Sequence, residues 1–248
     1  MGTATGKILR EQGATLALLY APFEASRKDQ IVEETYGSSP SGISTFECDI
    51  TSAKSVQHAF EAISKGAEAS GAATPSILVN AAGFVATSPL EDTPLEDTEM
   101  TFNANLLGPL LLSQAFAKLY WKHTSSAQPP VPGRIVSISS QAAHVALPEH
   151  AAYCASKAGL NALTRSMASE WGGRGITSNT VSPTVALTTL GKKAWADAKK
   201  RDDMLKQIPV GRFAEPNEIA EAIVFLCQDS SGMINGADVR LDGGFTIQ

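Results

Sequence analysis

Short apolar runs alternate with helical patterns along this chain, and no other feature of the sequence constrains its fold as strongly. The apolar runs typical of buried strands cover residues 14–20, 43–48, 76–80, 134–139, 176–181 and 237–241. Helical spacing of apolar side chains covers residues 55–69, 95–121, 152–172 and 216–227. Residues 124–133 are rich in proline and are expected to form an exposed loop. The alternation predicts an α/β fold with a doubly wound parallel sheet, which binds ligands beyond the carboxyl ends of its strands.

The composition narrows the classes of partner. A chain of 248 residues has the length of one α/β domain, so we expect a single domain over residues 1–248. The net charge is −5, without a basic patch, which argues against nucleic-acid binding. No apolar run approaches the ~20 residues of a membrane helix, and the first residues lack a signal-peptide pattern. The three cysteines show neither metal-ligand nor disulfide spacing, so we expect a cytoplasmic protein with no membrane partner and no metal.

Tyr153 and Lys157 are the first candidates for chemistry. They are four residues apart on a predicted helix, so both side chains lie on one face. At ~4 Å and an effective dielectric of ~20, an ammonium attracts a phenolate by roughly 4 kcal/mol before desolvation. That attraction can lower the pKa of the phenol toward general acid/base use. The alternative is an ordinary tyrosine and lysine on an amphipathic helix, and the pair alone is a weak signal.

Three further polar positions strengthen this interpretation. Ser140 follows a predicted strand, where its hydroxyl can bond a substrate carbonyl or merely turn the chain. Residues 80–83, Asn-Ala-Ala-Gly, follow another strand and either permit close approach of a flat ligand or form a plain turn. Asn105 interrupts the apolar face of a predicted helix. It either kinks that helix or holds a water that links Lys157 to solvent.

Together these residues resemble the short-chain dehydrogenase/reductase family in order and spacing over nearly the whole chain. The matching positions are Asn80–Gly83, Asn105, Ser140, Tyr153, Lys157 and the Asp-Gly-Gly of residues 242–244. The resemblance implies a Rossmann-type domain, a homotetramer and a nicotinamide cofactor. It implies that Tyr153 donates a proton to the substrate carbonyl and that Lys157 lowers the pKa of Tyr153 and binds the nicotinamide ribose. Ser140 would orient the carbonyl, and Asn105 would support a proton relay.

The resemblance also implies the cofactor contacts. These are Gly2, Asp49, Ile50, Asn80, Ala81, Gly83, Tyr153, Lys157, Pro183, Val185 and Thr188.

A closer likeness, to dicarbonyl/L-xylulose reductases, is carried by the C-terminal third of the chain. Most of the family has glycine after the proline at position 183, whereas this chain and that subgroup have threonine at position 184. Gln141 and His150 fit the same subgroup and are candidate substrate contacts. The alternative is that both are polar residues of a surface loop.

The N-terminus departs from the family pattern. The family begins with a strand and a Thr-Gly-x-x-x-Gly-x-Gly turn that cradles the cofactor pyrophosphate. Gly2 aligns with the last glycine of that turn, so the first strand and the earlier glycines are missing from this sequence. We expect unpaired backbone groups and an apolar slot in the sheet, with weak cofactor binding and reduced stability. A truncated gene model or isoform is favoured over a naturally shortened relative.

The choice of cofactor depends on position 20. NAD-specific relatives place an acidic residue there to bond the ribose 2′-hydroxyl, and this chain has Tyr20. We therefore expect NADP(H) rather than NAD(H), with Arg27 or Lys28 near the 2′-phosphate.

Three functions remain open at this point. The first is reduction of a small carbonyl compound, such as a ketose or an α-dicarbonyl. The second keeps this chemistry but takes a 3-oxoacyl thioester or a natural-product ketone as substrate. The third is a catalytically impaired, truncated paralogue that pairs with full-length subunits.

Overall fold

The computed structural model describes residues 1–38, 40–71, 73–124 and 131–247. Its strands are β1 (Leu16–Tyr20), β2 (Ile43–Glu47), β3 (Ile77–Asn80), β4 (Gly133–Ile138), β5 (Ile176–Pro183) and β6 (Asp238–Leu241). Its α-helices are α1 (Gly2–Glu11), α2 (Lys28–Tyr36), α3 (Ala53–Ser70), α4 (Leu95–Phe102), α5 (Gly108–Thr124), α6 (Ala151–Trp171), α7 (Thr189–Ala194), α8 (Ala198–Leu205) and α9 (Pro216–Cys227). The predicted alternation of strands and helices is confirmed.

All strand pairs run parallel, and they form two separate ladders. One ladder pairs β1 with β2, and the other has the order β3-β4-β5-β6. Among the described residues no strand joins β1 to β3. Parallel strands end at one edge of a sheet, so the segments that follow the strands of the larger ladder meet at its carboxyl edge.

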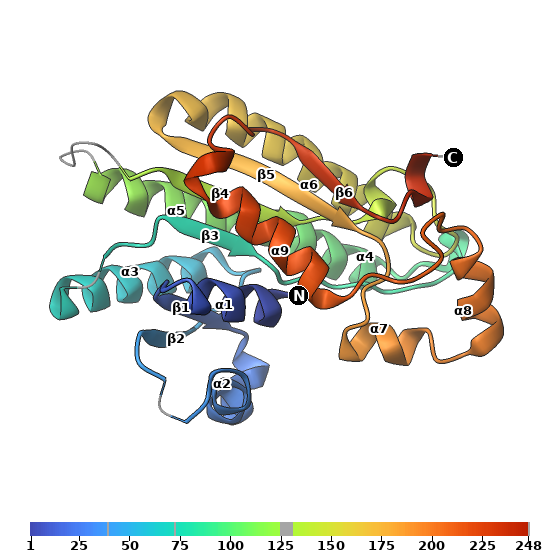
Figure 1. Cartoon of the computed structure of the whole chain (residues 1–248), viewed down its shortest axis with the longest axis horizontal. Coiled ribbons are helices and arrows are strands. Elements are labelled where there is room, and N and C mark those ends of the chain that lie inside the picture. Colours follow the sequence, from blue (N-terminus) through green and yellow to red (C-terminus); the bar gives the residue numbers. More distant parts are fainter. Residues whose placement is uncertain (39, 72, 125–130, 248) are drawn as a thin grey trace.

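Helices cover both faces of the larger ladder, as a doubly wound sheet requires. In Figure 1, α1 and α9 lie in front of the strands, and α5 and α6 lie behind them. Neighbouring residues of β4 illustrate the consequence. Ile135 packs in a cluster with Phe116 and Ile176, whereas Val136 packs in a cluster with Ile219 and Ile223. Both β4 residues are fully buried because alternate side chains point to opposite, equally covered faces.

The strands β1 and β3, which no strand joins to one another among the described residues, are less buried than the central strand β4 of the larger ladder. Every residue of β4 is buried, whereas only Asn80 of the four β3 residues is buried. No residue of β1 is buried, although its sequence is Leu-Ala-Leu-Leu-Tyr. Both strands lie at the end of a ladder, which accounts for their greater exposure, and the unpaired backbone groups expected from the sequence stay a prediction.

Two helical predictions need refinement. The long helix predicted over residues 95–121 is confirmed as an unbroken helical segment from α4 to α5, but Asn103–Leu107 form a π-helical turn within it. Helix α1 was not predicted, and Gly2 is its first residue. Of the predicted loop at residues 124–133, Thr124 ends α5 and Gly133 begins β4, while residues 125–130 lie outside the described residues. Among the described residues, none of the helices is both long and apolar enough to cross a membrane.

Candidate active site

Tyr153 and Lys157 lie one helical turn apart near the start of α6, as their spacing predicts. The Lys157 ammonium lies 5.7 Å from the centre of the Tyr153 ring. It also donates a hydrogen bond of 2.8 Å to the carbonyl oxygen of Ile138, the last residue of β4. This bond fixes the lysine against the carboxyl edge of the sheet, with only 4% of its surface exposed.

Ser140 joins this pair from the segment after β4. Its backbone is extended, and its hydroxyl oxygen accepts a hydrogen bond of 3.1 Å from the Ala142 amide. The same side chain lies close enough to the Tyr153 phenol to lower its pKa. The structure therefore brings together a serine hydroxyl, a phenol and an ammonium from two elements that are adjacent at the sheet edge.

The electrostatics differ from the expectation for Tyr153. Burial raises the pKa of the phenol above its usual value of 10, and the hydrogen bond with Ser140 opposes that rise. The expected lowering by Lys157 is not found, because removal from water penalises the phenolate more than its neighbours stabilise it. Burial also lowers the pKa of the Lys157 ammonium from 10.5 to about 8.

The lysine shift predicts a pH-dependent cost of folding. Below pH 8 the folded chain holds a buried charge, and this cost disappears as the pH rises toward the unfolded pKa near 10.5. The shift corresponds to a cost of about 3 kcal/mol in the free energy of folding. A substitution of Lys157 would remove this cost, but it would also lose the hydrogen bond to Ile138, which offsets about 1 kcal/mol or more of the gain. We expect Lys157→Met to raise the free energy of unfolding at pH 7 by about 1–2 kcal/mol. Urea unfolding at pH 7 and pH 10 tests this: a variant destabilised equally at both pH values would contradict it.

Asn105 lies in the π-helical turn between α4 and α5 and is fully buried. Its Oδ1 accepts from the Phe84 amide at 2.8 Å, and its Nδ2 donates to the Phe84 carbonyl at 2.8 Å and to Ser156 Oγ at 3.1 Å. A π turn is often found at a functional site. Here the π-helical turn places Asn105 where it hydrogen-bonds both the segment after β3 and α6.

Gly83 shows how close this segment lies to the polar groups. A Cβ atom at this position would lie 3.3 Å from Asn105 Oδ1 and 3.7 Å from Lys157 Nζ. The backbone after β3 therefore passes directly beside both side chains, and only a residue without a side chain leaves the space between them open.

The N-terminus of α1 faces the same segment. A Cβ atom on Gly2 would lie 2.9 Å from the Cβ of Ala81, which makes glycine necessary at this contact. Ala81, Ala82 and Gly83 are exposed. Small exposed residues beside the positive end of a ten-residue helix form a surface that fits a flat, anionic dinucleotide.

Asn80 plays a different part from its small neighbours. It is buried, and its Nδ2 donates to Ser113 Oγ at 3.3 Å and to Ser137 Oγ at 3.0 Å. Its Oδ1 has no partner among the described residues. Asn80 thus connects β3 to α5 and β4 behind the exposed Ala81–Gly83 segment.

The predicted adenine contacts, Asp49 and Ile50, follow β2 on the smaller ladder. One Asp49 oxygen accepts from the amide and the hydroxyl of Thr51 at 2.9 and 2.7 Å, so the carboxylate shapes its own turn. Ile50 packs against the start of α5, where a Cβ on Gly108 would lie 2.9 Å from its Cδ1. At the end of β1, the Lys28 ammonium lies 5.7 Å from the centre of the Tyr20 ring.

The remaining predicted cofactor contacts lie along the segment after β5. Pro183 ends β5, and Val185 is half-buried against the cluster of Met204, Ile208 and Phe213. The Thr188 hydroxyl accepts from the Gly191 amide at 3.0 Å and caps α7.

The two predicted substrate contacts flank the serine and the tyrosine. Gln141 is buried, and its Oε1 has no hydrogen-bond partner among the described residues. The ring of His150 lies edge-on to that of Tyr153, with centroids 6.3 Å apart, and its Nδ1 lies 2.6 Å from the Pro148 carbonyl oxygen. The groups that sequence reasoning missed are backbone and long-range partners: the carbonyl of Ile138 and the main chain of Phe84.

Comparison with known proteins gives the family. The sequence profile of a family described as enoyl-(acyl carrier protein) reductase matches residues 1–246. A relative, the D-threitol dehydrogenase of Mycolicibacterium smegmatis, is 47% identical over 203 residues, which are 82% of this chain and 73% of the relative. The chain belongs to the short-chain dehydrogenase/reductase family. The family expected from the sequence is thereby confirmed, and with it an oxidoreductase ancestry.

Two more relatives show the range of this oxidoreductase family. The NAD-dependent glycerol dehydrogenase of Listeria innocua is 35% identical over 250 residues, which are 100% of this chain and 90% of the relative. The L-xylulose reductase of Caenorhabditis elegans is 38% identical over 169 residues, which are 68% of this chain and 65% of the relative. Several relatives act on polyols and ketoses by name, in agreement with the subgroup predicted from the sequence.

A solved member of the short-chain dehydrogenase/reductase family supports the fold. The crystal structure of a gluconate 5-dehydrogenase from Burkholderia cenocepacia, in complex with NADP and tartrate, matches with a TM-score of 0.84 and 26% identity. The match covers 100% of this chain and 91% of that chain. The two ladders described above therefore keep the arrangement that their strands have in a Rossmann-type enzyme.

Proposed function

We propose that this chain reduces a small ketose or α-dicarbonyl compound with NADPH, and oxidises the corresponding alcohol in reverse. The observation that carries the proposal is the arrangement of Lys157 beside the Tyr153 ring and against the last residue of β4, with Ser140 in the segment that follows that strand. We further propose that residues 1–248 act as one domain in a cytoplasmic homotetramer.

The chain's own groups have distinct tasks in this proposal. When bound, the nicotinamide cofactor would supply the hydride. The Ser140 hydroxyl bonds the substrate carbonyl, and Tyr153 donates a proton to its oxygen. Lys157 binds the nicotinamide ribose. Asn105 has one Oδ1 lone pair left beside Gly83 and Lys157, which suits a water that returns the proton from solvent.

The cofactor would bind along the carboxyl edge. Gly2 and the α1 N-terminus would hold its pyrophosphate, and Ala81 and Gly83 would allow its close approach. Tyr20 supports NADP(H), because it stands at the end of β1 where NAD-specific relatives have an acidic residue, and the Lys28 ammonium beside it would have to exchange its pairing with Asp29 for a 2′-phosphate. One relative is NAD-dependent by name, so the assay must compare both cofactors.

The direct test is an absorbance assay of the purified chain at millimolar cofactor. We expect oxidation of NADPH with a short ketose or a diketone, and slower oxidation of NADH. Turnover of only a 3-oxoacyl thioester would favour the second function left open by the sequence, in which the substrate is a thioester or a natural-product ketone. Absence of turnover with every carbonyl, together with tight binding to a full-length relative, would favour a role as a subunit partner.

Gln141 offers a test of the substrate class. Its buried Oε1 lacks a partner among the described residues, so a substrate hydroxyl next to the carbonyl would satisfy it. We expect Gln141→Leu to raise KM for a ketose about 10-fold, while KM for a diketone without hydroxyl groups changes less than about twofold. Equal changes in KM for both substrates would show that Gln141 does not bind the substrate hydroxyl.

A further inference from the structure

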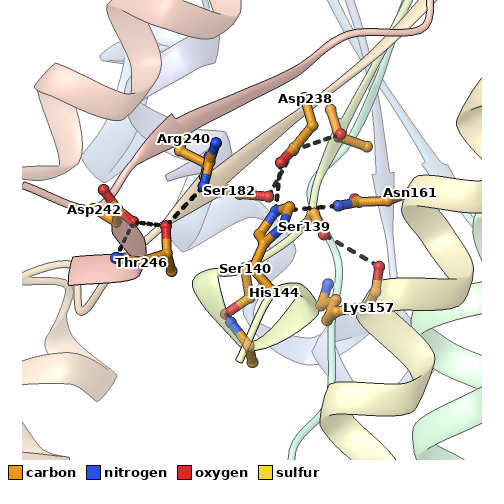
Figure 2. Close-up of polar contacts among 12 residues, drawn as sticks. Ser139, Ser140, His144, Lys157, Asn161, Ser182, Asp238, Arg240, Asp242 and Thr246 are labelled. Carbon is orange, nitrogen blue, oxygen red and sulfur yellow. Dashed lines mark hydrogen bonds and ion pairs between the residues drawn. The ribbon is translucent and has the colours of Figure 1, made fainter. Parts of the chain in front are cut away.

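A second polar cluster lies beside the catalytic residues and centres on Asp238, the first residue of β6. Its Oδ2 lies 2.6 Å from His144 Nε2. Its Oδ1 accepts from the hydroxyls of Thr180 and Ser182 on β5, at 2.7 and 2.6 Å. Figure 2 shows the His144 ring between Asp238 and the segment that carries Ser139 and Ser140. Because three donors converge on it, the carboxylate is held firmly in one position on the sheet.

His144 is joined to Ser140 by one turn of 3₁₀ helix, η4 (Gln141–Ala143). Ser140 caps the start of η4, and His144 is the residue that ends it. The Ala143 amide donates to the Ser140 carbonyl at 2.9 Å, and the His144 amide donates to the Gln141 carbonyl at 2.9 Å. These short-range bonds make residues 140–144 one unit, in which a movement of His144 is transmitted to Ser140 and Gln141.

His144, at the C-terminal end of residues 140–144, lies against two further elements, β6 and α6. His144 Nε2 contacts Asp238 on β6, and it lies 3.5 Å from Asn161 Nδ2 on α6. Asn161 is one turn beyond Lys157 on the same helix. The imidazole therefore meets the strand beyond β5 and the helix that carries both the tyrosine and the lysine.

The side chains of the pair are less exposed than those of a surface ion pair, although His144 lies at the surface. The side chains of His144 and Asp238 are 28% and 16% exposed, whereas those of Arg212 and Glu218, an ion pair of the same length, are 55% and 47% exposed. Shelter reduces screening by water and salt, so a contact between ionisable groups holds geometry better here than at the surface.

We propose that the His144–Asp238 pair is a clamp that positions Ser140 and Gln141 against Tyr153. The role in catalysis rests on the proposed reductase function, but the clamp itself is a property of the fold. His144 is a positioning residue, since it acts through η4 rather than on the substrate. Release of the clamp would let Ser140 drift from the carbonyl, and a displacement of about 1 Å is enough to cost up to about 100-fold in rate.

The test uses three variants of the full chain. His144→Ala removes the contact. His144→Gln keeps an amide donor near the position of Nε2 and should restore the contact without the ring. The matched control is His123→Ala at the end of α5, since His123 is also half-buried, at 24% exposure, and lies 3.9 Å from the carboxylate of Glu68.

Two measurements test separately whether the clamp exists and whether it affects the reaction. Hydrogen exchange of the backbone amides in residues 141–144 should quicken about 10-fold or more in His144→Ala and return toward wild type in His144→Gln. With NADPH saturating, kcat/KM for the carbonyl substrate should fall about 10- to 100-fold in His144→Ala, with the Kd for NADPH changed less than twofold. His123→Ala should alter neither quantity.

The outcomes are distinct. Unchanged exchange in His144→Ala would overturn the clamp. Faster exchange with unchanged kcat/KM would overturn its positioning role. A loss of activity that His144→Gln fails to restore would also overturn it, because it would assign the effect to the imidazole ring itself. If the wild-type chain reduced no carbonyl at all, the proposed function would fail, and the exchange measurement alone would decide whether the clamp exists.

Discussion

Replacing Tyr153 by phenylalanine is expected to lower kcat by about 1,000-fold. The change removes one hydroxyl, which is the group that donates the proton to the substrate carbonyl in the proposed mechanism. A positioned acid contributes about 100- to 10,000-fold to a proton transfer. The ring remains, so the packing of His150 against it and the 5.7 Å contact with Lys157 should persist. Single-turnover and steady-state measurements with saturating NADPH check the size of the loss.

Tyr120→Phe is the matched control for this prediction. The Tyr120 hydroxyl donates to the carbonyl oxygens of Val131 and Gly175, at 2.7 and 3.2 Å, and belongs to the core beneath α5. Its loss should lower the free energy of unfolding by about 1–2 kcal/mol and leave kcat unchanged. We therefore expect Tyr153→Phe to lower kcat, and Tyr120→Phe to lower only the free energy of unfolding. Retention of more than a tenth of wild-type kcat in Tyr153→Phe would assign the proton to another group.

The second large effect is expected from a strand added ahead of Met1. A five-residue apolar segment followed by a glycine-rich turn would insert between β1 and β3, where the described residues leave both facing strand edges unpaired. Each edge would gain a ladder of backbone hydrogen bonds, and the half-buried side chains of Leu16, Leu78 and Val79 would leave water. We expect the midpoint of thermal unfolding to rise by about 10 °C or more.

The same variant should bind cofactor more tightly. The added turn would place further backbone amides beside the α1 N-terminus, next to Ala81, where the pyrophosphate is proposed to lie. We expect the Kd for NADPH to fall at least about 10-fold, as measured by fluorescence titration. An extension of equal length built from glycine and serine is the control, because it adds mass without a strand. If both extensions behave like the 248-residue chain, or if that chain already binds NADPH at micromolar Kd, the proposed weakness at this edge is wrong.

Much of the fold follows from local patterns. Buried parallel strands need continuous apolar runs, and five of the six predicted runs end within one residue of the observed strand; β5 continues two residues further, to Pro183. The pair Tyr153 and Lys157 could be assigned to one face of a helix because four residues complete about one turn. Helix α1 was missed because Gly2, Thr3 and Thr5 are poor helix formers. Its contacts with α9 hold it in place instead.

The site was predictable only in part. The positions of Ser140, Asn105 and Gly83 follow from the family pattern, but their contacts do not. Asn105 holds the main chain of Phe84, which lies 21 residues away, and it lies in a π-helical turn that the apolar pattern does not reveal. The direction of the Tyr153 pKa shift was predicted wrongly, because spacing reveals a charged neighbour but not how much water has been removed.

The sequence by itself determined the strand order along the chain, the helix that carries Tyr153 and Lys157, and the family to which those residues belong. These features depend on neighbours within about one helical turn or one strand, where spacing fixes geometry. Only the tertiary structure decided that the sheet consists of two ladders, that burial governs the titration of Tyr153, and that Asp238 meets a histidine 94 residues away. Such contacts depend on how distant elements pack, and no local spacing encodes them.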